Sequence, residues 1–301
     1  MLPQLLVLTG LAFSQTPSNA HAWRGADPEL DRLASEFVAA ADKGDPLALA
    51  RLYLLTNAAE LLDTRGRLAV TLDRVRSGKT KLDPLLQDHV DYARIEQMMA
   101  QAKLAEAAAL RKSLGLVTEA LVLGPFDNAA GAGHGEAYPP EKSLDPEQPV
   151  DGRDRPIHWQ NSGEAGVLGV LPLGQLVVPA ADATAYVLVA IRAEKETLAA
   201  LRIGTTDAAK AWLGGVPVLD IERERRAELD QDSIPVTLSA GWTPLLVKVS
   251  WSGKGGRALI RLTAPKGGPL AGVTTSAALA DVKAALVPGR KAPPKVRAKH
   301  T

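Results

Sequence analysis

The chain has 301 residues, of which 46% are hydrophobic and 23% charged, a composition typical of a globular protein and too apolar for a disordered one. Lys and Arg number 35 and Asp and Glu 34, so the formal charge of +1 gives no overall field that would draw the chain onto nucleic acid or anionic lipid. The sequence has no cysteine, which excludes disulfides, thiol nucleophiles, cysteine-ligated zinc and a lipidated-cysteine anchor.

The first residues resemble an export signal. An apolar run over residues 2–13 precedes Ala20-His21-Ala22, which has the small-x-small pattern of a signal-peptidase site. The run departs from a typical signal in having no Lys or Arg before it. Residues 1–22 are therefore predicted to be a signal peptide, and the protein is expected in the periplasm or outside the cell. The run is shorter than the roughly 20 residues that span a bilayer, and no other segment is longer and as apolar, so no transmembrane segment is expected.

Residues 27–115 carry the signals of a helical domain. An aspartate followed by proline supplies an N-cap and a first helical residue at Asp27-Pro28, Asp45-Pro46 and Asp83-Pro84. Apolar residues follow the first of these at helical spacing until Gly44, and the third opens an Ala-, Leu- and Met-rich segment that ends at Gly115. Short connections predict antiparallel helical hairpins in a tetratricopeptide-like arrangement, although no clean 34-residue period emerges.

Beyond Gly115 the composition changes, because twenty of the 26 glycines and sixteen of the 21 prolines follow it. Short apolar or alternating runs bounded by turn residues predict strands; they cover residues 186–191, 199–203, 245–249 and 258–262. Gly214-Gly215 between two apolar runs suits a primed hairpin turn. These signals predict an antiparallel β-sandwich of the jelly-roll type over residues 118–265, and hence an α+β protein of more than one domain.

The last residues divide into two predicted segments. Residues 276–286 are expected to form a short helix. Residues 288–301 contain five Lys or Arg and no acid and are predicted to be a basic disordered tail. Such a tail is either a solvated terminus or a contact for an anionic polymer.

No motif identifies a catalytic or metal site. Gly78-Lys79-Thr80 matches the end of a phosphate-binding loop, but Asp73 stands where that loop needs a glycine, so a helix end is the better interpretation. His134 and His158 have no metal-ligand spacing, and no nucleophile-elbow pattern occurs. Calcium is the one cofactor left open, because three residues could supply oxygen ligands, while turn capping is the alternative role for the same side chains; they are Asp127, Asn128 and Asp207.

Four of the five tryptophans lie in the predicted sandwich, where an indole face could stack on a sugar ring. Trp212 comes just before the Gly-Gly turn and Trp242 just after Gly241, so both are expected in the core between the sheets. Trp159 and Trp251 are left open between the core and a sugar-binding surface.

Several segments resemble a known family. Residues 121–128, 138–141 and Trp159, followed by residues 202–207, 211–215 and 238–249, resemble a galactose-binding-like β-sandwich of large exported bacterial proteins. In those proteins it accompanies tetratricopeptide-like helices and often a transglutaminase-like domain. The resemblance covers about residues 118 to 263. Gly214 and Thr243 replace asparagines that the family usually has, which weakens any inherited polar site, and without cysteine no transglutaminase-like activity is implied.

These observations together predict a non-catalytic, exported binding or interaction protein of the bacterial envelope. The helical part would contact protein, and the sandwich would bind an envelope polysaccharide or a protein partner. The candidate ligand contacts are loop and rim residues, namely Asp127, Asn128, Tyr138, Asp207 and Trp251. Two alternatives remain, a purely structural assembly subunit without a small ligand and a glycoside hydrolase. An apolar helical groove would favour a protein partner, and a sandwich cleft lined by aromatic and amide groups would favour sugar.

Overall fold

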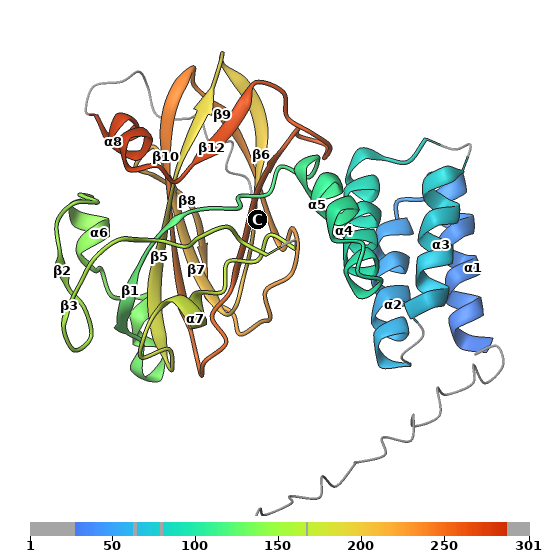
Figure 1. The fold of residues 1–301 in the computed structure, drawn as a ribbon, viewed down its shortest axis with the longest axis horizontal. Coiled ribbons are helices and arrows are strands. Elements are labelled where there is room, and N and C mark those ends of the chain that lie inside the picture. Colours follow the sequence, from blue (N-terminus) through green and yellow to red (C-terminus); the bar gives the residue numbers. More distant parts are fainter. Residues whose placement is uncertain (1–27, 63–64, 79–80, 167, 288–301) are drawn as a thin grey trace, which may run out of the picture.

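The structure is an α+β arrangement, with helices followed by a sandwich of antiparallel sheets (Figure 1). It is a computed structural model that describes residues 28–62, 65–78, 81–166 and 168–287. The predicted signal peptide at 1–22 and the predicted tail at 288–301 lie outside the described residues. In the described part of the chain no helix has the length and apolar character needed to cross a bilayer.

The helical part consists of successive helices that alternate with short connections. Their bounds are α1 (Pro28–Lys43), α2 (Ala48–Leu61), α3 (Arg65–Ser77), α4 (Pro84–Ala100) and α5 (Leu104–Lys112). The Asp83-Pro84 signal acts as expected: Asp83 is the N-cap of α4 and accepts hydrogen bonds from the amides of Leu85 and Leu86 at 3.0 and 3.4 Å, which have no partner within the helix. The expectation for Asp45-Pro46 is wrong, because α2 begins only at Ala48 and its N-cap is Leu47. Asp45 accepts the Leu47 amide at 2.8 Å in the turn before the helix.

The Ala-, Leu- and Met-rich segment that follows Asp83 and ends at Gly115 forms two helices, α4 and α5. Ala102 has φ of 59°, a left-handed conformation that ends α4, and the Lys103 amide bonds back to Met98 O at 2.8 Å. Nothing in the Ala-rich composition marks this break, because every residue there is a good helix former.

The first four helices share one apolar core. Leu30 and Phe37 of α1, Leu55 of α2, Leu72 of α3 and Val90 of α4 are completely buried together. Gly44, with φ of 65°, lets α1 end and α2 return beside it. This packing agrees with helical hairpins, while the tetratricopeptide-like repeat itself stays a prediction.

The sandwich contains two main sheets in which every strand pair is antiparallel. The larger has the order β4-β1-β5-β10-β7-β8, with β12 also pairing with β5, and the smaller has the order β11-β6-β9; β2 and β3 form a separate small hairpin. The strands are β1 (Leu121–Asp127), β2 (Val150–Asp151), β3 (Pro156–Ile157), β4 (Gln160–Asn161), β5 (Ala183–Ala193), β6 (Thr197–Thr205), β7 (Ala208–Leu213), β8 (Val216–Ile221), β9 (Asp232–Leu238), β10 (Gly241–Trp251), β11 (Ala258–Thr263) and β12 (Val273–Ser276).

The central strand β5 is buried on both faces, which explains its nearly continuous apolar sequence. Val187 and Val189 point into the core between the sheets, and Tyr186 and Leu188 point to the outer face. That outer face is covered by α8 (Leu279–Leu286), the helix expected at 276–286. Three short helical segments lie in the connections: η1 (Ala129–His134), α6 (Pro139–Lys142) and α7 (Leu173–Leu176).

Two glycine positions shape the chain as the sequence indicates. Gly214 and Gly215 have φ of 58° and 80° and link β7 to β8, as a primed turn requires. Gly115, with φ of 68°, lies against β11 so closely that a Cβ atom there would stand 2.1 Å from Leu262 O. The composition change near Gly115 therefore coincides with the point where the chain leaves the helices and meets the sandwich.

A small third core joins the helices to the sandwich. Ile95 of α4 and Ala107 of α5 pack with Leu229 and Leu259 of the sandwich, and all four are buried. The helical core and the core between the sheets remain separate clusters. The boundaries 27–115 and 118–265 stay predictions as boundaries of domains, because burial does not show whether either part folds alone.

Candidate functional site

The five predicted contact residues gather at one end of the sandwich, around the end of β10. Asn128 donates from Nδ2 to Trp251 O at 3.0 Å, and the next residue, Ser252, donates its amide to Asp207 Oδ2 at 2.9 Å. Tyr138 Oη donates to Asp127 O at 2.5 Å. The sequence thus selected residues that are neighbours in space.

Trp251 does not offer a ring face to a ligand, and that expectation is wrong. Its side chain is completely buried between the sheets, and its indole Nε1 donates to Ala180 O at 2.9 Å. Trp212 and Trp242, expected between the sheets, are instead half-buried on the outer face of the large sheet. The alternation of side chains along β10 explains the positions of Trp251 and Trp242. Val247, Val249 and Trp251 share the inner face, so Trp242, an odd number of positions away, points outward.

Asn128 and Asp207 use their polar atoms to hold loops. Asn128 is 4% exposed, and its Oδ1 accepts the Gly133 amide at 3.0 Å. Asp207 Oδ1 accepts the Arg225 amide at 3.1 Å, a turn-capping role. The described residues include no group of three or more His, Cys, Asp or Glu side chains placed to hold a metal ion, and calcium at these residues stays a hypothesis.

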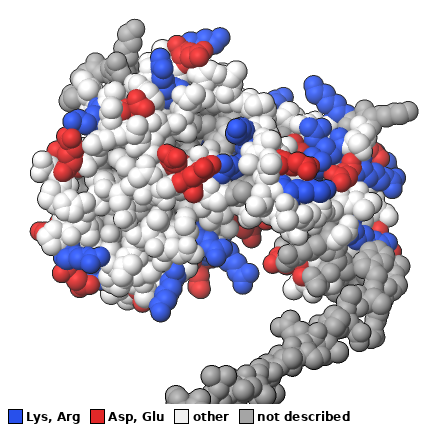
Figure 2. Space-filling model, in the orientation of Figure 1, with Lys and Arg blue, Asp and Glu red and all other residues white. Residues whose placement is uncertain are grey.

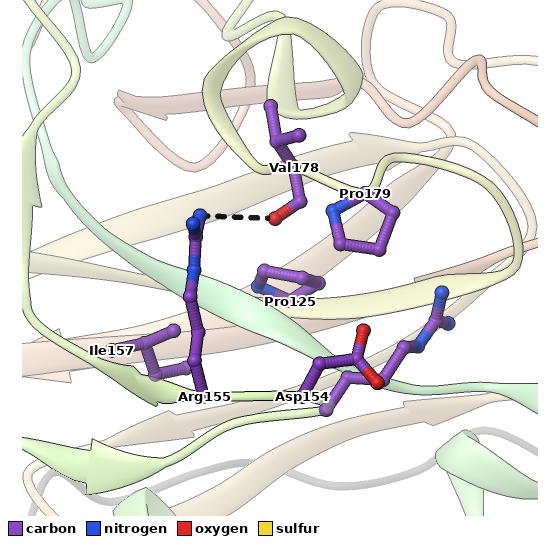
Figure 3. Close-up of a pocket in the computed structure, with 7 residues that line it drawn as sticks. Pro125, Asp154, Arg155, Ile157, Val178 and Pro179 are labelled. Atoms are coloured by element: carbon purple, nitrogen blue, oxygen red, sulfur yellow. Dashed lines mark hydrogen bonds between the residues drawn. The ribbon is translucent and has the colours of Figure 1, made fainter.

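A small pocket of about 200 Å³ lies beside this cluster (Figure 3). It is lined by Pro125, Arg153, Asp154, Arg155, Ile157, Val178 and Pro179. Arg155 donates to Val178 O at 3.2 Å, as the dashed line shows, and Arg153 donates to Ala181 O at 2.8 Å. Neither an aromatic ring nor a side-chain amide lines this pocket, so it lacks the features that would favour a sugar.

A larger groove, with a volume of about 540 Å³, runs between the helices and the sandwich. Residues of α2 and α4 form one wall, and the other wall comes from residues 168–170, residues 227–229 and the start of β11. The helical face carries Tyr53 and Tyr92 at half-buried positions together with the buried His89 and Gln97. Its size is within the range of ligand sites in proteins.

A buried charge network stands behind this groove and connects its walls. Arg261 of β11 donates from Nε and Nη2 to the two carboxylate oxygens of Asp230 at 2.7 and 2.5 Å. The same guanidinium donates from Nη1 to Asp88 of α4 at 3.0 Å. Arg202 of β6, opposite Arg261 in the sheet, lies 3.5 Å from Asp230. Two arginines and two aspartates therefore balance one another in the interior, as buried charges must.

The network reaches the groove through a histidine and a tyrosine. His89 Nε2 lies 3.1 Å from Asp230 Oδ2, and His89 Nδ1 lies 3.2 Å from Tyr53 Oη. Because ionised Asp230 can only accept, Nε2 carries a proton. The Tyr53 hydroxyl lies within hydrogen-bond distance of both His89 Nδ1 and Leu229 O, the latter at 3.4 Å. Tyr53, which lines the groove, is thus held in place by the charges behind it.

The charges in this network fix the protonation states. Burial alone would raise the pKa of Asp230, but hydrogen bonds from Arg261 and His89 hold it well below its usual range. Burial would lower the pKa of Arg261, yet Asp230 and Asp88 raise it overall. Burial lowers the pKa of Arg202. The Asp230 carboxylate and the Arg261 guanidinium therefore form a charged pair at neutral pH.

Acid is expected to weaken the fold through Asp230. Its pKa in the folded chain lies below the value in the unfolded chain, so its contribution to stability is complete above about pH 4 and is lost as the pH falls further. The measurement is the free energy of urea unfolding between neutral pH and pH 3. Asp230→Asn should show a shallower dependence than the wild type. Asp73→Asn, which removes a carboxylate that is 66% exposed, should keep the wild-type slope, and equal slopes for all three proteins would contradict this account.

Sequence reasoning missed the groove, although it contained a signal. Arg202 and Arg261 each interrupt an apolar strand, and they face one another across β6 and β11. Like charges at facing positions are destabilising unless acids lie nearby. Asp88-His89, in the interior of α4, supplies one such acid.

Comparisons with known proteins do not assign this chain to a family. No family model matches it, and no curated protein matches it. Solved structures that are similar over part of the chain include a family 35 carbohydrate binding module from an environmental isolate, with 12% identity and a TM-score of 0.24, covering 55% of this chain and 94% of that one. The PA14 domain of MpAFP antifreeze protein has 15% identity and a TM-score of 0.21, and the similarity covers 32% of this chain and 44% of that one.

A third similar structure is the beta-glucosidase from Kluyveromyces marxianus in complex with glucose, with 12% identity and a TM-score of 0.27 over 48% of this chain. This chain spans only 15% of the glucosidase and 44% of the PA14 chain. At these TM-scores the similarities carry no argument about function, which must come from the groove.

Proposed function

We propose that the chain is an exported, non-catalytic binding protein that holds a segment of a partner protein in the groove between the helices and the sandwich. The groove itself carries the proposal, because it is the larger of the two cavities described above. Export rests on the signal-like pattern of residues 1–22, and it places the protein in the periplasm or outside the cell.

The lining fits a polypeptide segment, while its two tyrosines and two amides leave a sugar as the alternative. Met99, Leu168 and Val170, all half-buried, supply apolar surface, and Asn57 and Gln97 supply amide groups. Apolar surface accepts side chains, while amides can pair with the polar main chain of an extended segment. No tryptophan lines the groove. The small pocket of the sandwich, where a sugar was the alternative, has no aromatic ring in its lining.

A matched pair of tryptophan substitutions tests the proposal. Ala100 lines the groove at the end of α4, and Ala50 of α2 lies outside it; both are exposed helical alanines. Peptides are selected from a random display library on the wild-type protein, and their affinities are measured by fluorescence anisotropy. Ala100→Trp should weaken binding at least about tenfold by occupying the groove. Ala50→Trp should leave the affinity unchanged.

The same proteins separate the alternatives. If the selected peptides bind Ala100→Trp as well as wild type, the groove is not the site. Binding to a glycan array that survives Ala100→Trp and is lost in Arg155→Ala would assign sugar to the pocket of the sandwich instead. One observation supports the glycoside hydrolase alternative: three glutamates line the groove. Hydrolysis of a glycan panel at mildly acidic pH, lost in Glu96→Gln, would replace the binding proposal with that activity.

A further inference from the structure

The groove has an excess of acidic side chains. Glu60 of α2, Glu96 of α4 and Glu228 of the loop before β9 line it, and Arg257 is the one arginine or lysine among its lining residues. All four side chains are exposed. On the face shown in Figure 2, acidic and basic side chains are interspersed, and the whole chain is almost neutral. The lining of the groove is therefore more acidic than the chain as a whole.

The buried network does not cancel this excess. Arg261 and Arg202 are the cations nearest to the groove from behind, but Asp88 and Asp230 already pair with them. His89 lies between Asp230 and Tyr53, with its ring nitrogens 3.1 and 3.2 Å from Asp230 Oδ2 and Tyr53 Oη. A ligand that enters the groove therefore meets the negative charge of the glutamates that line it.

The two groove tyrosines are partly buried and line the groove together with these carboxylates. Burial raises the pKa of Tyr53 to about 12, and the charges of Asp230 and Glu228 contribute to the rise. Burial also raises the pKa of Tyr92, with a contribution from Glu96. Phenol rings beside carboxylates suit a cation, because the face of the ring carries a negative quadrupole that attracts Lys and Arg.

We propose that the groove selects a basic polypeptide segment, in which Lys or Arg side chains contact Glu60 and Glu228 while apolar side chains pack on Val170 and Met99. This inference rests on the proposed function and adds the chemical class of the partner. Charge complementarity of this kind raises the association rate and rejects acidic segments.

Three labelled peptides with the same leucines test the inference, with lysine, glutamine or glutamate at the remaining variable positions. We expect the lysine peptide to bind best and to weaken as salt is raised, because rim charges are screened. The double variant Glu60→Gln/Glu228→Gln should weaken the lysine peptide about fivefold and leave the glutamine peptide unchanged. The matched control Glu106→Gln/Glu224→Gln removes one exposed acid from the helices and one from the loop before β9, both outside the groove, and should have no effect.

The outcomes distinguish this inference from the proposed function. Equal binding of all three peptides, blocked by Ala100→Trp, would overturn the preference for basic segments and leave the groove as a peptide site. If only library-selected peptides without basic residues bind, the preference for basic segments is likewise overturned and the groove remains a peptide site. If neither these peptides nor any library peptide binds, both proposals fail. Equal losses in the two double variants would show that the effect comes from total charge and would overturn the inference.

Discussion

Replacing Arg261 with methionine is expected to destabilise the protein by about 3–5 kcal/mol, the cost of breaking a buried ion pair from one side. Arg261 is 1% exposed, and its guanidinium is the partner of both Asp88 and Asp230. Methionine fills a similar volume but leaves these two carboxylates without their strongest donor. The loss also reaches His89 and Tyr53, because Asp230 holds the histidine ring.

Urea unfolding measures this effect, with Arg257→Met as the matched control. Arg257 is exposed and lies just before the same strand, so its replacement should change stability by less than about 0.5 kcal/mol. If Arg261→Met does not fold, the stability of the triple variant Asp88→Asn/Asp230→Asn/Arg261→Met is measured instead. Removing the acids together with the arginine should recover part of the loss. Stability of Arg261→Met equal to that of Arg257→Met would contradict the account.

This network also determines how the walls of the groove are placed. Asp88 and His89 come from α4, Arg261 and Arg202 from the small sheet, and Asp230 from the loop before β9. Charge-assisted hydrogen bonds with two fixed donors are directional. They therefore hold α4 at a defined distance and angle from β11, which apolar contacts alone would specify less strictly.

Local signals in the sequence were sufficient for much of the fold. The four predicted strand segments lie within β5, β6, β10 and β11, the Gly-Gly turn joins β7 to β8, and the helix expected at 276–286 contains α8. Each of these features depends on a few neighbouring residues. The break at Ala102 was not visible, because a left-handed alanine is stabilised by its surroundings rather than by its own preference.

The candidate site was harder to predict because periodicity shows which residues share a face but not what that face meets. Trp251 was misplaced for a simpler reason: its alternation with Val247 and Val249 already places it inside. The network behind the groove joins residues far apart in the chain, with 173 positions between Asp88 and Arg261. Two facing arginines in apolar strands indicate that an acid must be near, and only the packing of α4 identifies it.

Lys248 is the second position where a large effect is expected. It lies in the middle of β10 and is completely buried. Its Nζ donates to Glu141 at 2.8 Å and to the carbonyl oxygens of His134 and Glu136 at 3.2 and 2.5 Å. Burial lowers the pKa of Lys248, while the Glu141 carboxylate opposes that change. The ammonium group thus attaches the segment from His134 to Glu141 to the central strand.

Lys248→Met is expected to destabilise the protein by about 3–5 kcal/mol, because Glu141, with 14% of its side chain exposed, loses its cation. The variant should also be cleaved faster by protease within residues 134–141, since their carbonyl groups lose a donor. Lys210→Met is the matched control: Lys210 faces Lys248 on β7 and makes a more exposed ion pair with Asp220 at 3.7 Å, an interaction of modest value.

Two opposing effects decide the result for Lys248. Methionine removes the cost of burying a charge, and in some proteins this makes the replacement of a buried ion pair neutral or favourable. That gain requires both partners to be removed, so Lys248→Met/Glu141→Gln should be more stable than the sum of the single losses predicts. A neutral Lys248→Met with unchanged proteolysis would show that the desolvation cost dominates and that residues 134–141 are held by other contacts. Additive losses would show that lysine and glutamate act independently despite their 2.8 Å separation.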